Sequence, residues 1–198
     1  MTDEKTVSFY NRNVLNYTNL IKKLPDHKSL DRFLSFLTKK SKIMDLGCGI
    51  GNYSNYMQEN GMIVECIDAS EEMIKTARNT FNLNANVLTF LEFNEINKYD
   101  ALWANFSLLH SSKKDFVYHI KSIYKSLKLG GIFYLGLKLG KGQRRDKLGR
   151  LYSYYTEDEI SKILDFERFK ILEKTFGSNI GMVGQKEPWI GIFSKKIK

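Results

Sequence analysis

The chain has 198 residues and a formal net charge of +9. This length fits one α/β domain that buries a core without disulfides, and Cys48 and Cys66 lack the spacing of metal ligands. No apolar run approaches the roughly 20 residues of a membrane span, and the polar residues 2–5 argue against a signal peptide. We therefore expect a cytoplasmic protein with no metal site and no membrane partner.

Helical patterns and apolar runs follow one another along the chain. An amphipathic helix is predicted over residues 8–23 and a short one over 29–38, after a break at Pro25 and Asp26. The sequence beyond residue 41 then alternates strands and helices, as a wound α/β sheet requires. One helix is predicted over residues 52–59, and a second begins after the N-cap Ser70. A third begins after the N-cap Ser112 and ends at Gly130-Gly131. A fourth begins at a capping box over residues 156–159. The strands are predicted at residues 42–46, 62–68, 86–91, 100–106, 132–137, 169–176 and 189–195.

The first strand runs into a glycine-rich turn that opens a helix. Its glycines are spaced G-x-G-x-G at 47, 49 and 51, whereas dinucleotide folds use G-x-G-x-x-G to receive a pyrophosphate. Asp45 just before the turn would oppose a pyrophosphate. Asp68 lies at the end of the second strand, close to the roughly 20-residue distance at which an acid binds ribose hydroxyls. The pattern indicates a nucleoside cofactor.

Residues 43–51 (IMDLGCGIG) resemble motif I of the class I S-adenosylmethionine-dependent methyltransferases, usually (V/I/L)-L-D-(L/I/V)-G-C-G-x-G. The resemblance covers the whole chain. It implies a Rossmann-like, doubly wound seven-stranded sheet in three α/β/α layers, mostly parallel, with an antiparallel last strand. Residues 1–40 would form an N-terminal helical cap and 41–198 the core of the same domain. The cofactor implied is S-adenosyl-L-methionine, released as S-adenosyl-L-homocysteine.

In that family the turn wraps the methionine part of the cofactor, the acid after strand 2 holds the ribose, and the adenine lies beside the end of strand 3. The resemblance therefore implies a set of cofactor-binding residues: Asp45, Gly47, Cys48, Gly49, Gly51, Asp68, Ala69, Ser70, Met73, Phe90, Leu91 and Asn105.

The catalytic candidates are Asn105, near the end of the fourth predicted strand, and His110, in the segment that follows it. The carboxyl end of this strand borders the ligand crevice of open α/β sheets. His110 would remove a proton from an oxygen or nitrogen nucleophile, or else only order its loop by hydrogen bonding. His27 and His119 have no obvious partner in the sequence and are interpreted as structural.

The segment 142–155 resembles small-molecule methyltransferases of type 11/12 and of the tellurite-resistance branch, and more distantly tRNA wobble-uridine methyltransferases. The substrate-binding candidates for an anionic or planar substrate are Tyr10, Tyr17, Arg145, Arg150, Tyr152 and Tyr155. Alternatively, Tyr154 and Tyr155 pack the last helix. The basic residues between Lys138 and Arg150 would contact phosphate or form a solvated loop.

The sequence thus favours transfer of a methyl group to a small molecule. An RNA (tRNA) methyltransferase and a non-catalytic S-adenosylmethionine-binding protein remain as alternatives. The acceptor atom and the oligomeric state are left open.

Overall fold

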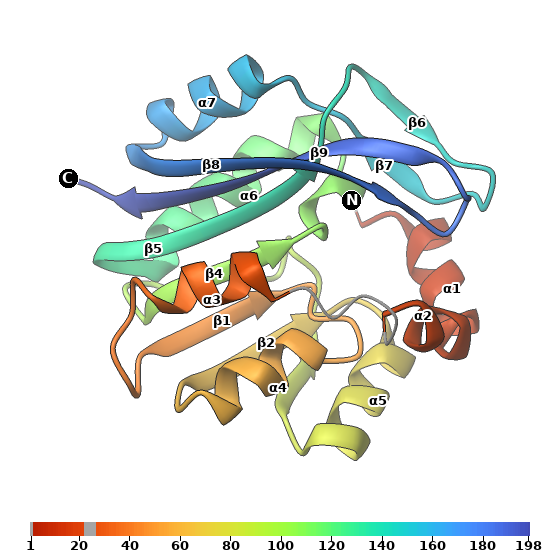
Figure 1. Ribbon diagram of the computed structural model, residues 1–198, viewed down its shortest axis with the longest axis horizontal. Coiled ribbons are helices and arrows are strands. Elements are labelled where there is room, and N and C mark those ends of the chain that lie inside the picture. Colours follow the sequence, from red (N-terminus) through yellow and green to blue (C-terminus); the bar gives the residue numbers. More distant parts are fainter. Residues whose placement is uncertain (1, 22–26) are drawn as a thin grey trace.

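The computed structural model describes residues 2–21 and 27–198, and its centre is a seven-stranded sheet in the order β3-β2-β1-β4-β5-β9-β8 (Figure 1). The strands are β1 Lys42–Leu46, β2 Ile63–Asp68, β3 Asn84–Val87, β4 Tyr99–Asn105, β5 Leu127–Lys138, β8 Phe169–Ile180 and β9 Lys186–Lys196. A separate small hairpin pairs β6 Gln143–Arg145 with β7 Leu151–Ser153. The helices are α1 Glu4–Arg12, α2 Val14–Ile21, α3 Lys28–Leu34, α4 Asn52–Glu59, α5 Glu71–Phe81, α6 Lys113–Ser126 and α7 Glu157–Phe166, with a 3-10 turn at Leu108–His110.

The predicted topology is confirmed. β1 to β5 run parallel, and β9 inserts antiparallel between β5 and β8. Alternate residues of each strand face opposite layers. Ile43 packs with Phe33 of α3 and Met57 of α4, whereas Met44 joins Phe116 of α6 and Leu164 of α7 in a second cluster. Helices therefore cover both faces of the sheet.

Several predicted boundaries are confirmed by the caps that set them. The Ser70 and Ser112 side chains accept from the amides of Met73 and Asp115, and Thr156 with Glu159 forms a complete capping box.

Other boundaries differ for local reasons. The first predicted helix is divided at Asn13 into α1 and α2, and the break predicted at Pro25-Asp26 lies outside the described residues. Gly130-Gly131 does not end α6; α6 ends at Ser126, and Leu127 already pairs with Tyr99 in the sheet. The third strand begins at Asn84, earlier than predicted, because Asn82 closes α5 in a left-handed conformation. This strand ends at Val87, before the predicted end at residue 91.

The helices α1 and α2 and the β6–β7 hairpin lie together at the carboxyl ends of the parallel strands, at the right of Figure 1. Asn11 Oδ1 fixes α1 there by accepting from Ser70 Oγ at 2.7 Å and from the Glu72 amide at 3.2 Å. These segments cover the edge of the sheet where ligands bind in open α/β folds. No helix in the described part of the chain is long and apolar enough to cross a membrane.

Candidate functional site

A cavity of about 660 Å³ occupies this carboxyl edge, within the range of small-molecule sites. It extends from the glycine turn and Asp68 to a second end formed by α1, the β6–β7 hairpin and the β8–β9 turn. We call these the Asp68 end and the Arg150 end. The cavity wall includes fourteen of the residues predicted from the sequence: Tyr10, Tyr17, Gly47, Gly49, Asp68, Ala69, Ser70, Met73, Phe90, Leu91, Asn105, His110, Arg150 and Tyr152.

The glycine turn brings bare backbone to the cavity. Gly47 has φ +77°, and a Cβ there would lie 2.3 Å from Ser107 Cβ. Gly49 also has a positive φ, and the Tyr17 ring of α2 lies 3.4 Å from where its Cβ would be. Gly51 is the N-cap of α4 and does not border the cavity; a Cβ there would lie 2.5 Å from Leu83 Cδ1. The turn therefore requires glycine both for its conformation and for its close packing.

Asp45 and Cys48, like Gly51, support the turn from behind instead of lining the cavity. Asp45 is buried and accepts a 2.7 Å hydrogen bond from Ser54 Oγ. Burial raises the pKa of Asp45 to about 7, against the opposing effect of that hydrogen bond. Cys48 packs in the small cluster under α5. None of these three residues lines the cavity, and their contact with a cofactor stays a prediction.

Asp68 lies at the end of β2 with its carboxylate fixed by backbone amides. Its Oδ2 accepts from Gly49 N at 2.9 Å and its Oδ1 from Ser70 N at 2.8 Å. Burial raises the pKa of Asp68, and these hydrogen bonds act in the opposite direction. A carboxylate oriented in this way beside a cavity can accept hydrogen bonds from ribose hydroxyls.

Phe90, Leu91 and His119 form the wall next to Asp68. The His119 ring lies edge-on to Phe90, with centroids 5.7 Å apart, and burial lowers its pKa to about 4. Its Nδ1 is buried with no hydrogen-bond partner among the described residues. The sequence does not predict this wall position, although His119 shares the helical apolar stripe of Phe116 and Ile123.

The end of β4 carries backbone strain. Asn105 pairs in register with Gly136, where a Cβ would lie 2.5 Å from Asn105 Oδ1. Phe106 follows with φ +53°, a conformation that bulky side chains rarely adopt, and its amide donates to Gly136 O at 3.0 Å. Both Asn105 and Phe106 line the cavity. Such strain is typical of functional sites, and Phe106 is a wall residue that sequence analysis missed.

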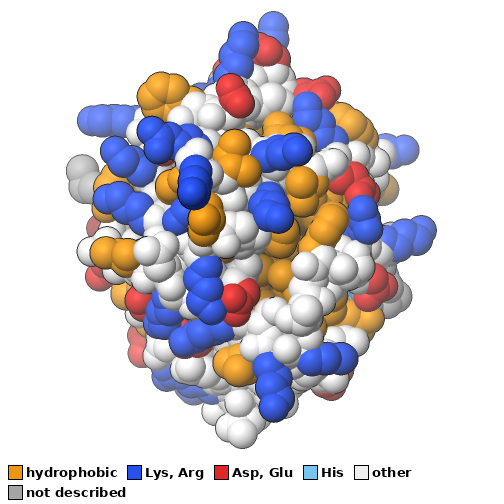
Figure 2. Space-filling model, turned by 90° about the vertical axis from the view of Figure 1, so that its left-hand side faces the viewer, with side chains coloured by type: hydrophobic (Ala, Val, Ile, Leu, Met, Phe, Trp, Pro, Cys, Tyr) orange, Lys and Arg blue, Asp and Glu red, His pale blue; other side chains and the backbone are white. Residues whose placement is uncertain are grey.

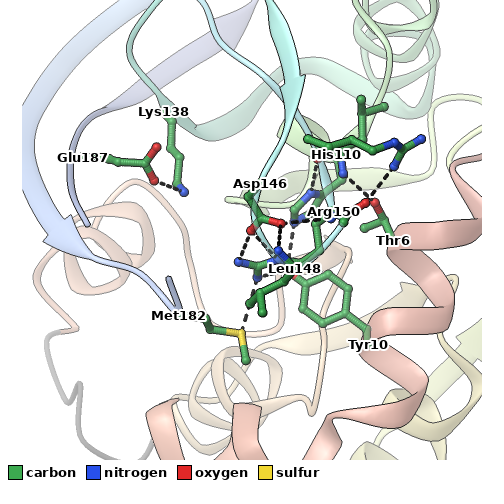
Figure 3. Close-up of polar contacts among 12 residues, drawn as sticks. Thr6, Tyr10, His110, Lys138, Asp146, Leu148, Arg150, Met182 and Glu187 are labelled. Carbon is green, nitrogen blue, oxygen red and sulfur yellow. Dashed lines mark hydrogen bonds and ion pairs between the residues drawn. The ribbon is translucent and has the colours of Figure 1, made fainter. Parts of the chain in front are cut away.

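His110 and Tyr10 meet at the Arg150 end (Figure 3). His110 Nδ1 lies 2.7 Å from the Leu151 carbonyl oxygen, so Nδ1 carries the proton and Nε2 accepts from the Tyr10 hydroxyl at 2.9 Å. Burial lowers the pKa of His110 to about 4. The imidazole is therefore neutral at pH 7. Its remaining basic atom, Nε2, accepts the hydrogen bond from the Tyr10 hydroxyl.

Two ion pairs, one almost fully buried and one partly buried, complete this end. Asp146 Oδ2 accepts from Arg150 Nε at 2.9 Å and from Nη2 at 2.7 Å, while Arg150 Nη1 donates to Tyr10 OH at 3.2 Å and to Met182 Sδ at 3.4 Å (Figure 3). Lys138 pairs with Glu187, and its Nζ lies 4.0 Å from the centre of the Tyr152 ring. No sequence signal marks Glu187 as the partner of Lys138, because 49 residues separate the two.

Two predicted substrate-binding residues lie elsewhere. Arg145 is outside the cavity and binds both carboxylate oxygens of Asp3 at 3.0 and 2.6 Å. Tyr155 is buried in the core against Phe116, with ring centroids 4.5 Å apart, in agreement with the packing alternative. Within the described residues, no group of three or more His, Cys, Asp or Glu side chains could hold a metal ion.

Comparisons with known proteins agree with this geometry. A family model described as "Methyltransferase domain" matches residues 43–131. A carboxy-S-adenosyl-L-methionine synthase of Campylobacter fetus is 30% identical over 145 residues, which are 70% of this chain but only 60% of that protein's length. A malonyl-[acyl-carrier protein] O-methyltransferase of Buchnera aphidicola is 27% identical over 187 residues, covering 91% of this chain and 74% of that protein.

Solved structures show the same fold. The 1,6-didemethyltoxoflavin-N1-methyltransferase of Burkholderia thailandensis, solved with 1,6-didemethyltoxoflavin and S-adenosylhomocysteine, superposes with a TM-score of 0.80 at 17% identity, covering 98% of this chain and 88% of that one. The complex of the Haloferax volcanii Trm112 activator with a methyltransferase gives a TM-score of 0.78 at 13% identity, covering 98% of each chain.

Proposed function

This chain belongs to the class I S-adenosylmethionine-dependent methyltransferase family, and from that premise we propose that it methylates a small molecule bound at the Arg150 end of the cavity. Membership in the family gives S-adenosylmethionine as the cofactor. Bound, this cofactor supplies a sulfonium-activated methyl group, so the protein needs to provide orientation, exclusion of water and a route for one proton.

The residues of the Asp68 end fit such a cofactor. Gly47 and Gly49 leave the backbone accessible, the Asp68 carboxylate would accept from ribose hydroxyls, and Met73, Phe90 and Leu91 offer an apolar wall for the adenine. Neither Phe90 nor Leu91 has a polar side chain, so this wall would contact the adenine through apolar surface and backbone groups.

The observation that carries the proposal is the continuity of the cavity. One space joins Asp68 to His110 and Tyr10, and the α1 helix and the β8–β9 turn help to enclose its second end. An acceptor held there would lie beside the cofactor in a site of limited volume. This arrangement supports a small acceptor over a polymer.

Tyr10 and His110 would handle the acceptor's proton. When an N–H, O–H or S–H nucleophile forms its bond to the methyl carbon, the carbon–sulfur bond breaks and the sulfur keeps that electron pair. The nucleophile then carries a positive charge and loses a proton. The neutral His110 Nε2 would take it through the Tyr10 hydroxyl that it already binds.

The RNA alternative receives less support. Of the basic residues between 138 and 150, Lys138, Arg145 and Arg150 are engaged in ion pairs within the protein. Figure 2 shows a dense array of lysine and arginine side chains on the face at the left of Figure 1, at the amino ends of the parallel strands and away from the cavity. A charge that steers RNA to the site would lie around its entrance.

The test combines calorimetry with S-adenosylhomocysteine and incubation of methyl-labelled cofactor with small-metabolite extract or tRNA. We expect cofactor binding and label in a small product, with Tyr10→Phe and His110→Gln reducing turnover but not binding. Tyr56→Phe is the matched control, because its hydroxyl binds Asp31 outside the cavity.

Label in tRNA alone would favour the RNA alternative. Binding without transfer would favour the non-catalytic alternative, and failure to bind would overturn the cofactor assignment. Mass spectrometry of the same samples would detect a carboxylated cofactor, the product for which the C. fetus relative is named.

A further inference from the structure

Resting on that proposed function, we propose that the methyl acceptor is an uncharged, planar aromatic or heteroaromatic molecule, held by ring contacts and not by an ion pair. The proposal chooses between the two substrate types that the sequence left open, anionic and planar. It follows from the state of the charged groups at the Arg150 end.

The Arg150 guanidinium has no free face for a carboxylate. Its Nε and Nη2 donate to Asp146, and its Nη1 donates to Tyr10 and Met182. Asp146 is itself held in the loop by the amides of Leu148 and Arg150, which donate to Oδ1 at 2.9 and 3.0 Å. The pair is almost fully buried, with 4% of the Arg150 side chain and 10% of the Asp146 side chain exposed. An anionic acceptor would have to displace this built-in carboxylate and leave it buried without a partner.

The second cation is neutralised in the same way. Lys138 pairs with Glu187, which also accepts from Tyr154 OH at 2.8 Å, so neither charge needs a ligand. Hydrogen bonds to Lys138 and Tyr154 keep the pKa of Glu187 low despite its partial burial. His110 is uncharged and uses both ring nitrogens. Asp3, a further charged residue of this wall, is paired with Arg145, so each of these formal charges has a partner of opposite sign.

Aromatic rings supply much of the uncharged contact surface. The cavity wall at and beside this end contains Tyr10, Phe106, Tyr152 and Trp189. Flat faces and edges of this kind bind a planar ring by stacking and edge-to-face contact, which requires no charge on the ligand. An uncharged ring is therefore the acceptor that the Arg150 end binds without disturbing its own ion pairs.

Three naphthalene probes with one ring system and different charge test this proposal: 2-naphthol, 2-naphthoate and 2-naphthylmethylammonium. Their affinities are measured by calorimetry on the full chain saturated with S-adenosylhomocysteine. We expect 2-naphthol to bind at least about tenfold more tightly than either charged probe. A tighter wild-type complex with the carboxylate or the ammonium probe, or no binding of 2-naphthol, would overturn the proposal. S-adenosylhomocysteine affinity is measured first, so failure of the cofactor assignment is separated from failure of this one.

Two variants test whether the ion pairs at the Arg150 end are what excludes an anionic ligand. Asp146→Asn keeps an oxygen for the loop amides but frees the Arg150 charge, so 2-naphthoate should gain about tenfold while 2-naphthol changes little. Glu187→Gln frees Lys138 and should give the same shift if Asp146→Asn does not fold. Asp165→Asn, an exposed carboxylate outside the cavity, is the matched control. Unchanged selectivity in the folded variants would contradict the proposal.

Discussion

The two ends of the cavity are built in different ways. The Asp68 end uses a short turn and the residues directly after β2, so its backbone amides and glycines lie close together in the sequence. The Arg150 end takes Tyr10 from α1, His110 from the turn after β4, Arg150 from the hairpin and Glu187 from β9. One end depends on local backbone conformation, and the other depends on side chains that only the fold brings together.

This difference predicts where variation is tolerated. The glycine turn admits few substitutions, because its three glycines have positive φ and a Cβ at Gly47 or Gly51 would collide with a neighbouring side chain. A cluster of paired side chains can instead be altered pair by pair. Substitutions at the two ends should therefore differ in what they change: cofactor affinity at the Asp68 end and stability at the Arg150 end.

Gly47→Ala should abolish cofactor binding, lowering S-adenosylhomocysteine affinity by more than about 100-fold, since its Cβ would lie 2.3 Å from Ser107 Cβ. Calorimetry and thermal unfolding measure affinity and folding separately. Gly142→Ala is the control: it has a similar φ of +78°, with no described atom within 4 Å of the added Cβ, so it costs only about 1–2 kcal/mol of backbone strain. Equal losses of S-adenosylhomocysteine affinity in the two variants would contradict the role of Gly47 in cofactor binding.

Arg150→Met should lower the free energy of unfolding by about 3–5 kcal/mol, because it leaves the buried Asp146 carboxylate without its cation. Urea denaturation measures this loss, and adding Asp146→Asn should restore much of it. S-adenosylhomocysteine affinity should stay within about threefold of wild type, since this pair belongs to the Arg150 end. A large loss of cofactor affinity would show that the two ends are coupled.

Asp68→Asn should weaken S-adenosylhomocysteine binding by roughly 10- to 100-fold, about 2 kcal/mol, through loss of charge-assisted hydrogen bonds to the ribose. The stability contributed by Arg150 and Asp146 should not change. If Asp68→Asn binds the cofactor like wild type, the carboxylate does not hold the ribose.

The stability of the protein should depend on pH through His110. Burial lowers its pKa to about 4 in the folded state, so the unfolded chain binds more protons between about pH 4 and 6.5 and stability falls as pH falls through that window. Because His110 lies on a cavity wall that water reaches, we expect a contribution of about 1–2 kcal/mol. The difference in unfolding free energy between wild type and His110→Gln should shrink on acidification; parallel curves would contradict the assignment.

Arg145→Met should have the smallest effect, less than about 1 kcal/mol, because its pair with Asp3 is partly exposed. The hydrogen-bonded guanidinium lowers the pKa of Asp3, and the small gain in stability from this pair should disappear in high salt. A larger, salt-independent loss would indicate that this contact anchors α1.

Local signals account for what could be predicted. The bounds of β1 and α4 follow from apolar runs and turn residues, and the caps at Ser70, Ser112 and Thr156 lie where the sequence indicated. The positions of Phe106, His119 and Glu187 in the cavity wall could not be predicted, because each depends on the packing of elements that are distant in the sequence.

The sequence by itself determined the sheet, the glycine turn and Asp68, because backbone conformation and strand periodicity are properties of neighbouring residues. From the sequence alone, Arg150 is also a candidate for binding an anionic or planar substrate. Only the tertiary structure decided what that arginine does: the hairpin folds Asp146 back onto it, and α1 brings Tyr10 against it. A buried charge takes its chemical role from the partners around it, and those partners come together only when the chain is folded.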